Sequence, residues 1–200
     1  MARYTDFKRY ITSYLKRELA PDLYYHGFHH TEQVMENVIE IARAEKLNRY
    51  ELTLLKVAVW MHDAGFAKVY IGHEDASKVM TRKLLPEYGY SREEIKLICG
   101  MIEATKIPQK PTTLCEKILA DADLLYLGTS AFKKIGDTLY EEMKIYAGLQ
   151  DVQTWNLIQQ KFLESHSFHT RYCHDKYEPA KQRNLKKVIA LNEKLRSKAS

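Results

Sequence analysis

The 200-residue sequence is poor in the residues that force turns or cross-link a chain. It has only 8 glycines and 5 prolines, so few turns are imposed and long helices can form. Its three cysteines, Cys99, Cys115 and Cys173, form no CxxC pair, and we interpret them as free, buried thiols in a reducing compartment. A chain of this length can bury a hydrophobic core without disulfides.

Long apolar runs are also missing. The longest, such as residues 57–61, are far too short to cross a bilayer, and the first residues lack the apolar stretch of a signal peptide. We therefore expect a cytoplasmic protein with no membrane partner. The net charge of +5 suits an anionic substrate but indicates no clear nucleic-acid site. The dense basic run at residues 181–187 is interpreted as a solvated helix face.

Helical periodicity dominates what is present, and no stretch alternates with a period of two. The sequence predicts an all-α protein with one domain over residues 1–200. In it, a helical bundle spans about residues 22–130, and C-terminal helices in 131–200 pack on this core. Helices are expected over residues 4–19, from about 30, from 48 to 65, and over 74–85, 91–104, 113–128, 131–146, 151–165 and 177–196.

Two helix starts carry a capping-box pattern, in which a polar residue precedes a glutamate by three positions. Asn48 and Glu51 form one such pair, and Thr113 and Glu116 form the other. Gly65 is placed to end the helix that Asn48 begins.

The most informative segment is Ala-Val-Trp-Met-His-Asp-Ala-Gly at residues 58–65, where His62 and Asp63 end an otherwise apolar helix. A buried carboxylate costs several kcal/mol unless it is paired or bound to a metal ion. A carboxylate at a helix C-terminus also opposes the helix dipole. A metal ion would offset both penalties. Taken alone, however, the pair fits better a core histidine hydrogen-bonded to its neighbour.

Further polar residues interrupt two other apolar helices. His30 continues the buried stripe of Val34 and Val38, and Asp121 and Asp123 lie in the apolar run at residues 118–127. The neighbours of Asp123 three and four positions away are all apolar or aromatic, so we expect Asp123 to face the interior more squarely than Asp121. Such a nitrogen and oxygen donor set suits Mn, Fe, Co, Ni, Zn or Mg, but not a closed structural zinc site.

Four segments together resemble the HD superfamily of metal-dependent phosphohydrolases. Residues 25–31 (Tyr-His-Gly-Phe-His-His-Thr) resemble its opening Tyr-His-Asn-x-x-His-Thr segment, and residues 60–66 (Trp-Met-His-Asp-Ala-Gly-Phe) resemble its His-Asp helix end. Residues 73–77 (His-Glu-Asp-Ala-Ser) and 119–128 (Leu-Ala-Asp-Ala-Asp-Leu-Leu-Tyr-Leu-Gly) resemble the two elements that follow. Order and spacing are preserved across residues 25–128.

The resemblance implies a bundle of helices around a metal ion held by His30, His62, Asp63 and Asp123. Two-metal members of the family carry further histidines after the His-Asp helix. His73 could be one of these, but Lys106 stands near the other expected place. We therefore expect one divalent ion per chain.

The predicted mechanism uses a water molecule activated by that metal ion, which would lower the pKa of the water and neutralise charge on phosphoryl oxygens. Asp63 is expected to orient the water. Glu74 is the candidate general base, although a surface glutamate explains it equally well. Lys106 is a candidate for holding the phosphate, although a solvated lysine is slightly favoured. His26 and His73 are candidates for substrate contact.

Other histidines are interpreted differently. His29 is expected to be exposed, because it points about one helical step away from His30. His166, His169 and His174 lie close in sequence, and packing or hydrogen bonding explains them better than a second metal site.

The leading functional hypothesis is hydrolysis of a phosphate ester or anhydride in a nucleotide or another small phosphorylated metabolite. One alternative is a di-iron oxygenase of the same fold, which needs two metal ions. Another is a non-catalytic module that senses a nucleotide or a metal. The sequence leaves the native metal and the oligomeric state open.

Overall fold

The structure is a computed structural model that describes residues 2–199, with side chains described for residues 3–197. All regular elements in this part of the chain are helices and none is a strand, which confirms the all-α prediction. It forms two compact units, Met1–Asp123 and Leu124–Ser200, that are described separately below. The prediction that the C-terminal helices pack on the motif-bearing core stays a prediction. Within residues 2–199, no helix combines the length and apolar character needed to span a membrane.

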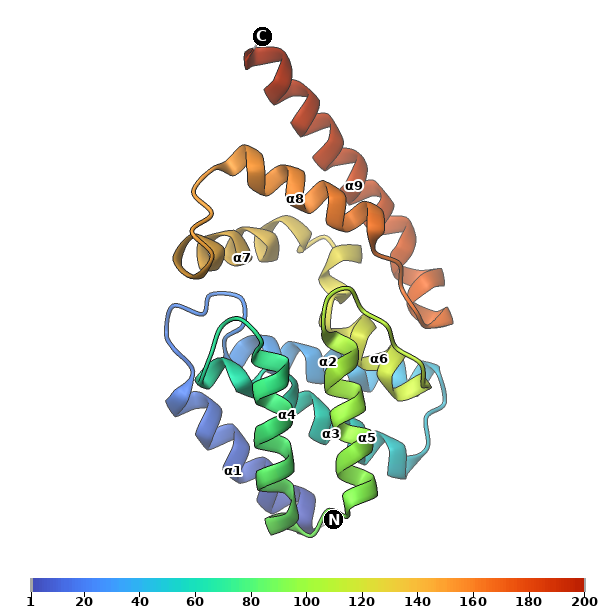
Figure 1. The fold of residues 1–200 in the computed structure, drawn as a ribbon. Coiled ribbons are helices and arrows are strands. Elements are labelled where there is room, and N and C mark those ends of the chain that lie inside the picture. Colours follow the sequence, from blue (N-terminus) through green and yellow to red (C-terminus); the bar gives the residue numbers. More distant parts are fainter. Residues whose placement is uncertain (1, 200) are drawn as a thin grey trace. The chain divides into compact units, whose positions relative to one another are not determined.

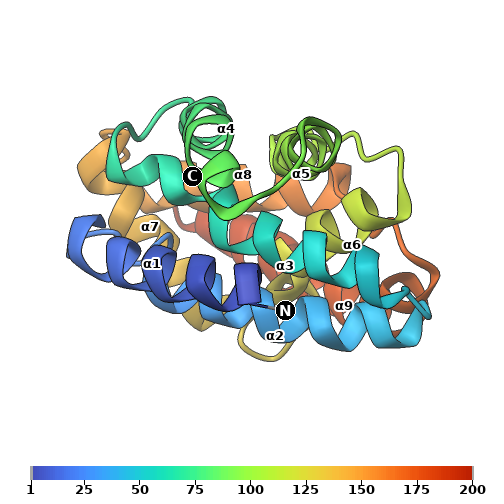
Figure 2. The ribbon, with the colours of Figure 1, turned by 90° about the horizontal axis from the view of Figure 1, so that it is seen from below.

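The first unit contains helices that surround one central helix (Figures 1 and 2). In chain order its elements are α1 (Ala2–Glu18), α2 (Phe28–Ala44), α3 (Arg49–His62), η1 (Ala64–Ala67), α4 (His73–Leu84), η2 (Leu85–Tyr88), α5 (Arg92–Thr105) and α6 (Leu114–Asp123).

The central element of this unit is α3, which contacts α1, α2, α4, α5 and α6. From Val57 to His62 every side chain of α3 is buried. A helix that is buried on all sides must lie inside the bundle rather than on its surface. His62 and Asp63, which end this apolar run, therefore lie in the interior of the bundle.

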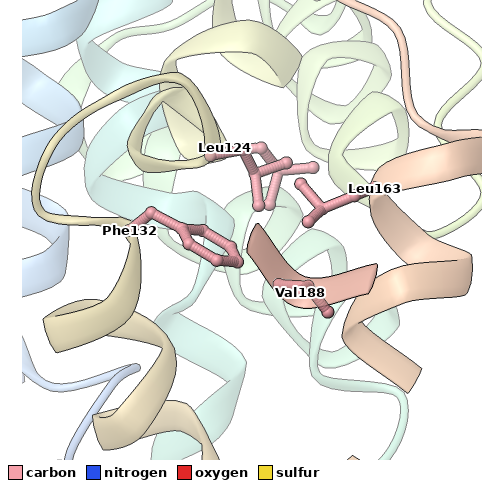
Figure 3. Close-up of a cluster of buried hydrophobic side chains, with 5 residues drawn as sticks. Leu124, Phe132, Leu163 and Val188 are labelled. Atoms are coloured by element: carbon pink, nitrogen blue, oxygen red, sulfur yellow. The ribbon is translucent and has the colours of Figure 1, made fainter. Parts of the chain in front are cut away.

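The second unit contains η3 (Leu125–Gly128), α7 (Phe132–Tyr146), α8 (Val152–Ser165) and α9 (Arg171–Ala199). Its core is a cluster of five buried side chains, Leu124, Leu127, Phe132, Leu163 and Val188. Figure 3 shows this cluster and labels all of its members except Leu127. Both α8 and η3 pack against α9. The second unit thus has a hydrophobic core of its own.

Both predicted capping boxes are present. The backbone N–H of Glu51 donates to Asn48 Oδ1 at 2.9 Å, and the backbone N–H of Glu116 donates to Thr113 Oγ1 at 3.3 Å. In each case the glutamate side chain accepts a hydrogen bond from the capping residue's backbone N–H in return. These caps could be predicted from the sequence because each involves side chains and backbone groups only three residues apart.

Several predicted boundaries are wrong. The helix from Thr113 ends at Asp123 and continues as the separate turn η3. The last helix begins at Arg171 rather than at residue 177, and it contains Pro179. A proline inside a helix removes a hydrogen bond and costs about 3 kcal/mol. The helix α9 packs against α8 and η3, and such packing between distant segments cannot be recognised from local sequence.

Gly65 does not end α3 as predicted. The helix ends at His62 with Asp63 as its C-terminal cap, and Gly65 lies inside η1. A Cβ atom at position 65 would lie 2.0 Å from the backbone oxygen of His73. The Gly65 N–H donates to Ser77 Oγ at 2.8 Å, and Ser77 is fully buried. Glycine is needed here because η1 and α4 approach each other closely.

Candidate metal centre

Three elements of the first unit end at one point and bring four polar side chains together. His30 comes from the first turn of α2, His62 and Asp63 from the end of α3, and Asp123 from the last residue of α6. Asn37 helps to fix this arrangement, because its side-chain amide donates to the backbone oxygen of Ala122 at 2.8 Å and so ties α2 to α6.

The donor atoms of these side chains lie close together. His30 Nε2 lies 2.9 Å from Asp123 Oδ1 and 3.4 Å from Asp63 Oδ2. His62 Nε2 lies 3.2 Å from Asp63 Oδ2 and 3.7 Å from Asp123 Oδ1. Atoms that share one ion at about 2.1 Å lie about 3 to 4.3 Å from one another, depending on the angle between the bonds. The four distances therefore fit ligands of a common ion.

Two of these atoms are buried without a hydrogen-bond partner, namely His62 Nε2 and Asp63 Oδ2. His62 Nδ1 lies 2.7 Å from the backbone oxygen of Val59, which identifies Nδ1 as the N–H donor. The Nε2 atom of neutral His62 then presents its lone pair to the two carboxylates, as in histidines that bind a metal. Unsatisfied buried atoms are costly in a protein interior, so this pair fits a site built for a cation.

Electrostatics support the same conclusion. Burial lowers the pKa of His62, but Asp63 and Asp123 outweigh this effect and raise the pKa well above its ordinary value. Burial also raises the pKa of both aspartates, yet the neighbouring histidines outweigh it. The pKa of Asp63 falls well below its usual range, and that of Asp123 falls to about 2. The point where these atoms meet therefore attracts a cation strongly.

His73 and Glu74 lie beside this centre, at the start of α4. His73 Nδ1 lies 3.1 Å from the backbone oxygen of Tyr70, so Nδ1 is the N–H donor and Nε2 carries the lone pair, as in His62. That nitrogen lies 3.5 Å from Asp63 Oδ1 and 3.5 Å from Glu74 Oε1. Asp63 thus faces His30 and His62 with one oxygen and His73 with the other.

An aromatic stack holds the histidines on this side. The ring of Phe66 stacks on His73 with centroids 3.8 Å apart and on His26 with centroids 4.3 Å apart. His26 in turn lies 5.8 Å from the ring of His30. Phe66 directly follows the His-Asp-Ala-Gly segment, but nothing in the sequence indicates this contact, because only the turn of η1 brings its ring against both histidines.

Lys106 lies on the exposed side of the first unit, where its Nζ contacts Asp75 Oδ2 at 3.0 Å. Asp75 also contacts Lys78 Nζ at 2.7 Å, and Lys78 pairs in addition with Glu103. The hydrogen bond that Lys106 donates to Asp75 raises the pKa of Lys106, and the negative charges of Asp75, Glu103 and Glu74 add to this shift. Lys106 therefore stands near Glu74, at the end of a chain of ion pairs.

The expected ranking of the two aspartates in α6 by burial is wrong. Asp121 is fully buried, whereas the side chain of Asp123 is 14% exposed. Yet Asp123 is the residue that contacts His30 and His62. Apolar neighbours on the same helix do not report which face is deepest, because packing from α2 and α5 decides it.

The C-terminal histidines form no comparable group. His166 is buried, His169 is half-buried and His174 is exposed, as is His29 in the first unit. Among the described residues, His30, His62 and Asp123 offer ligand atoms that all lie within 4.8 Å of one another, and Asp63 Oδ2 lies within 3.4 Å of both histidine nitrogens. Lys181, which we interpreted as part of a solvated basic face, is instead only 1% exposed.

The fold and the centre define an all-α protein with a buried histidine and aspartate site for a divalent ion. Residues 27–127, about half of the chain, match the sequence model of a family described as HD domain, and the chain belongs to this family. All four residues of the centre lie in the matched region.

A solved structure described as a predicted HD superfamily hydrolase, from an uncultured Thermotogales bacterium, is similar to this chain. The sequence identity is 20%, the TM-score is 0.58, and the match covers 96% of this chain and 92% of that chain. This likeness shows a shared fold. No curated protein sequence matches this chain.

Proposed function

We propose that the chain is a metal-dependent phosphohydrolase that cleaves a phosphate ester or anhydride in a nucleotide or another small phosphorylated metabolite. The observation that carries the proposal is the convergence of His30, His62, Asp63 and Asp123 on one buried point. The word hydrolase in the description of the similar solved structure agrees with this class.

His30, His62, Asp63 and Asp123 would hold one divalent ion, with Mn, Mg, Fe, Co, Ni and Zn as candidates. When bound, such an ion lowers the pKa of a coordinated water molecule and neutralises charge on phosphoryl oxygens. The backbone oxygen of Val59 supports this role, because it fixes the His62 ring in the tautomer that a metal requires.

Asp63 and Glu74 are the residues that we assign to the nucleophilic water. Asp63 Oδ1 and Glu74 Oε1 both lie 3.5 Å from His73 Nε2, so the two carboxylates flank one nitrogen. Asp63 would orient the water. Glu74 would accept the proton that the water loses during attack, and its position beside His73 supports this role.

His26, His73 and Lys106 are the candidates for contact with the substrate. The rings of His26 and His73 both stack on Phe66 and lie 5.8 Å from each other, which limits the movement of both rings. Lys106 is 42% exposed and pairs with Asp75, which is 59% exposed. An exposed ion pair contributes about 0 to 1 kcal/mol, so Lys106 can exchange Asp75 for a phosphate group at little cost.

The test is a panel of phosphorylated substrates assayed with added Mn, Mg, Co and Ni, followed by variants on the best substrate. Asp63→Asn should keep the helical content but bind metal more weakly, and hydrolysis should fall by orders of magnitude. Glu74→Gln should reduce turnover by roughly 10²- to 10⁴-fold while metal occupancy stays near that of the wild type. Glu93→Gln, at an exposed position of α5, is the matched control and should be unchanged.

An active Asp63→Asn protein would remove this mechanism, because among the described side chains Asp63 is the carboxylate that contacts His30, His62 and His73. Glu74→Gln with wild-type turnover would leave the phosphohydrolase assignment in place but remove Glu74 from it. A chain that binds metal and hydrolyses no member of the panel would favour the sensing module.

A further inference from the structure

A second charged cavity lies between α4 and α5, which run side by side in the first unit (Figure 1). Its volume is about 610 Å³. Its walls carry four cationic side chains, one carboxylate and a set of apolar or small residues; the nine are Lys78, Arg82, Pro86, Arg92, Ile95, Lys96, Cys99, Gly100 and Glu103. We call this cavity the α4–α5 groove.

The positive charge of the groove is mostly uncompensated. Lys78 pairs with Asp75 and Glu103, which accounts for the carboxylate in the wall. Arg82, Arg92 and Lys96, in contrast, form no ion pair with any described residue, and all three are exposed. Three like charges around one cavity repel each other, and a bound anion would relieve this repulsion.

The groove is separate from the candidate metal centre. None of the four residues of that centre, nor His73 or Glu74, lines it. Along α4, Arg82 lies nine residues beyond His73, which corresponds to about 13 Å at the rise of an α-helix. Lys78, in the wall of the groove, pairs with Asp75, and Asp75 pairs in turn with Lys106.

The chemistry of the groove favours phosphate groups. A guanidinium group matches a phosphate with two parallel hydrogen bonds, and the groove offers two such groups, one from each helix. Apolar walls from Pro86, Ile95 and Cys99 suit the uncharged part of a ligand. The volume falls within the range of about 300 to 1,000 Å³ that is usual for small-molecule sites. No aromatic side chain lines the groove, whereas single-stranded nucleic acid sites rely on aromatic stacking.

We propose that the α4–α5 groove binds a small molecule that carries a di- or triphosphate group, at a site distinct from the metal centre. Arg82 and Arg92 hold the phosphates and Lys96 adds a third positive charge. The proposal does not depend on the proposed hydrolase function, since it needs neither metal nor turnover.

The test is titration calorimetry of the full chain in chelator, where no metal-dependent turnover occurs. The probes are ATP, inorganic tripolyphosphate and adenosine. ATP and tripolyphosphate should bind with a 1:1 ratio and weaken as salt increases, and adenosine should not bind. The difference in affinity between ATP and tripolyphosphate measures how much the apolar walls contribute to binding.

Variants assign the binding to the groove. Arg82→Gln with Arg92→Gln should weaken binding at least about tenfold, because each loses a charge-assisted hydrogen bond to phosphate. Lys96→Gln tests the third charge and keeps the assignment measurable if the double variant folds poorly. Arg43→Gln, an exposed arginine in the last turn of α2, is the matched control and should bind as the wild type does.

Four outcomes would overturn the proposal. The first is no saturable binding at millimolar tripolyphosphate, and the second is adenosine binding as tight as that of ATP. The third is an equal loss of affinity in Arg43→Gln and in the groove variants. The fourth is a single-stranded oligonucleotide that displaces ATP at far lower concentration than free nucleotide does.

Discussion

At the residue scale, His62 and Asp63 show how two adjacent polar residues become tolerable at the end of a buried helix. The Val59 carbonyl accepts a hydrogen bond from His62 Nδ1, which leaves the other ring nitrogen facing carboxylates. Asp63 divides its two oxygens between different histidines. Both residues are buried, so their contacts with one another and with a cation must replace the water that each has lost.

The two aspartates of α6 give a test of this arrangement. A divalent ion should raise the melting temperature of the wild type, with stabilisation of about 2.7 kcal/mol at an ion concentration 100 times its dissociation constant. Asp123→Ala should remove most of that shift, because Asp123 contacts both histidines. Asp121→Ala should lower the melting temperature without metal, since Asp121 is fully buried, but should keep most of the shift.

Thermal melts of both variants with and without Mn provide the measurement. A shift that survives in Asp123→Ala and disappears in Asp121→Ala would show that the wrong aspartate has been placed in the centre.

At the scale of elements, the junction between α8 and α9 is held by a buried lysine. Lys181 Nζ donates to the backbone oxygen of His166 and contacts Glu178 Oε1 at 2.9 Å. It also lies 3.4 Å from His166 Nδ1. Burial, with the adjacent Lys181 ammonium and His169, lowers the pKa of His166 to about 4, although Glu178 opposes this shift.

This lowered pKa predicts a loss of stability in mild acid. The unfolded chain binds a proton on His166 at about pH 6.5, whereas the folded chain resists protonation down to about pH 4. Stability from this residue is therefore full above pH 6.5 and falls as the pH decreases. Between pH 6.5 and 5 the expected loss is about 1.5 kcal/mol.

The two tryptophans allow this loss to be assigned, because Trp60 lies in the first unit and Trp155 in the second. In a Trp60→Phe background, urea unfolding followed by Trp155 fluorescence reports on the second unit. His166→Gln should remove most of the loss between pH 6.5 and 5. An unchanged pH dependence in His166→Gln would assign the loss to other groups.

At the scale of the whole molecule, all candidate metal ligands belong to the first unit. We expect one divalent ion per chain, and elemental analysis of protein purified without chelator measures it. The count matters because His73 is a candidate ligand for a second ion. Its Nε2 faces Asp63 Oδ1, whereas His62 faces the other oxygen, Oδ2. Two tightly held irons per chain, with an iron optical spectrum, would contradict the count and favour the di-iron oxygenase.

The sequence by itself determined the helices and the residues that gather at the centre. Capping residues such as Asn48 and Thr113 act on backbone groups three positions away, so their effect can be predicted from the local sequence. Polar residues that interrupt apolar helices, such as His62 and Asp63, also stand out without a structure, because burying them is costly unless something compensates.

Only the tertiary structure decided which surfaces these side chains meet. Asp121 is more deeply buried than Asp123, Phe66 stacks on two histidines, and Lys181 is buried at a helix junction. Each outcome depends on contacts between segments far apart in sequence or on the exact turn between two elements. Helical periodicity gives the direction of a side chain about its own axis, but the neighbouring helices determine what lies in that direction.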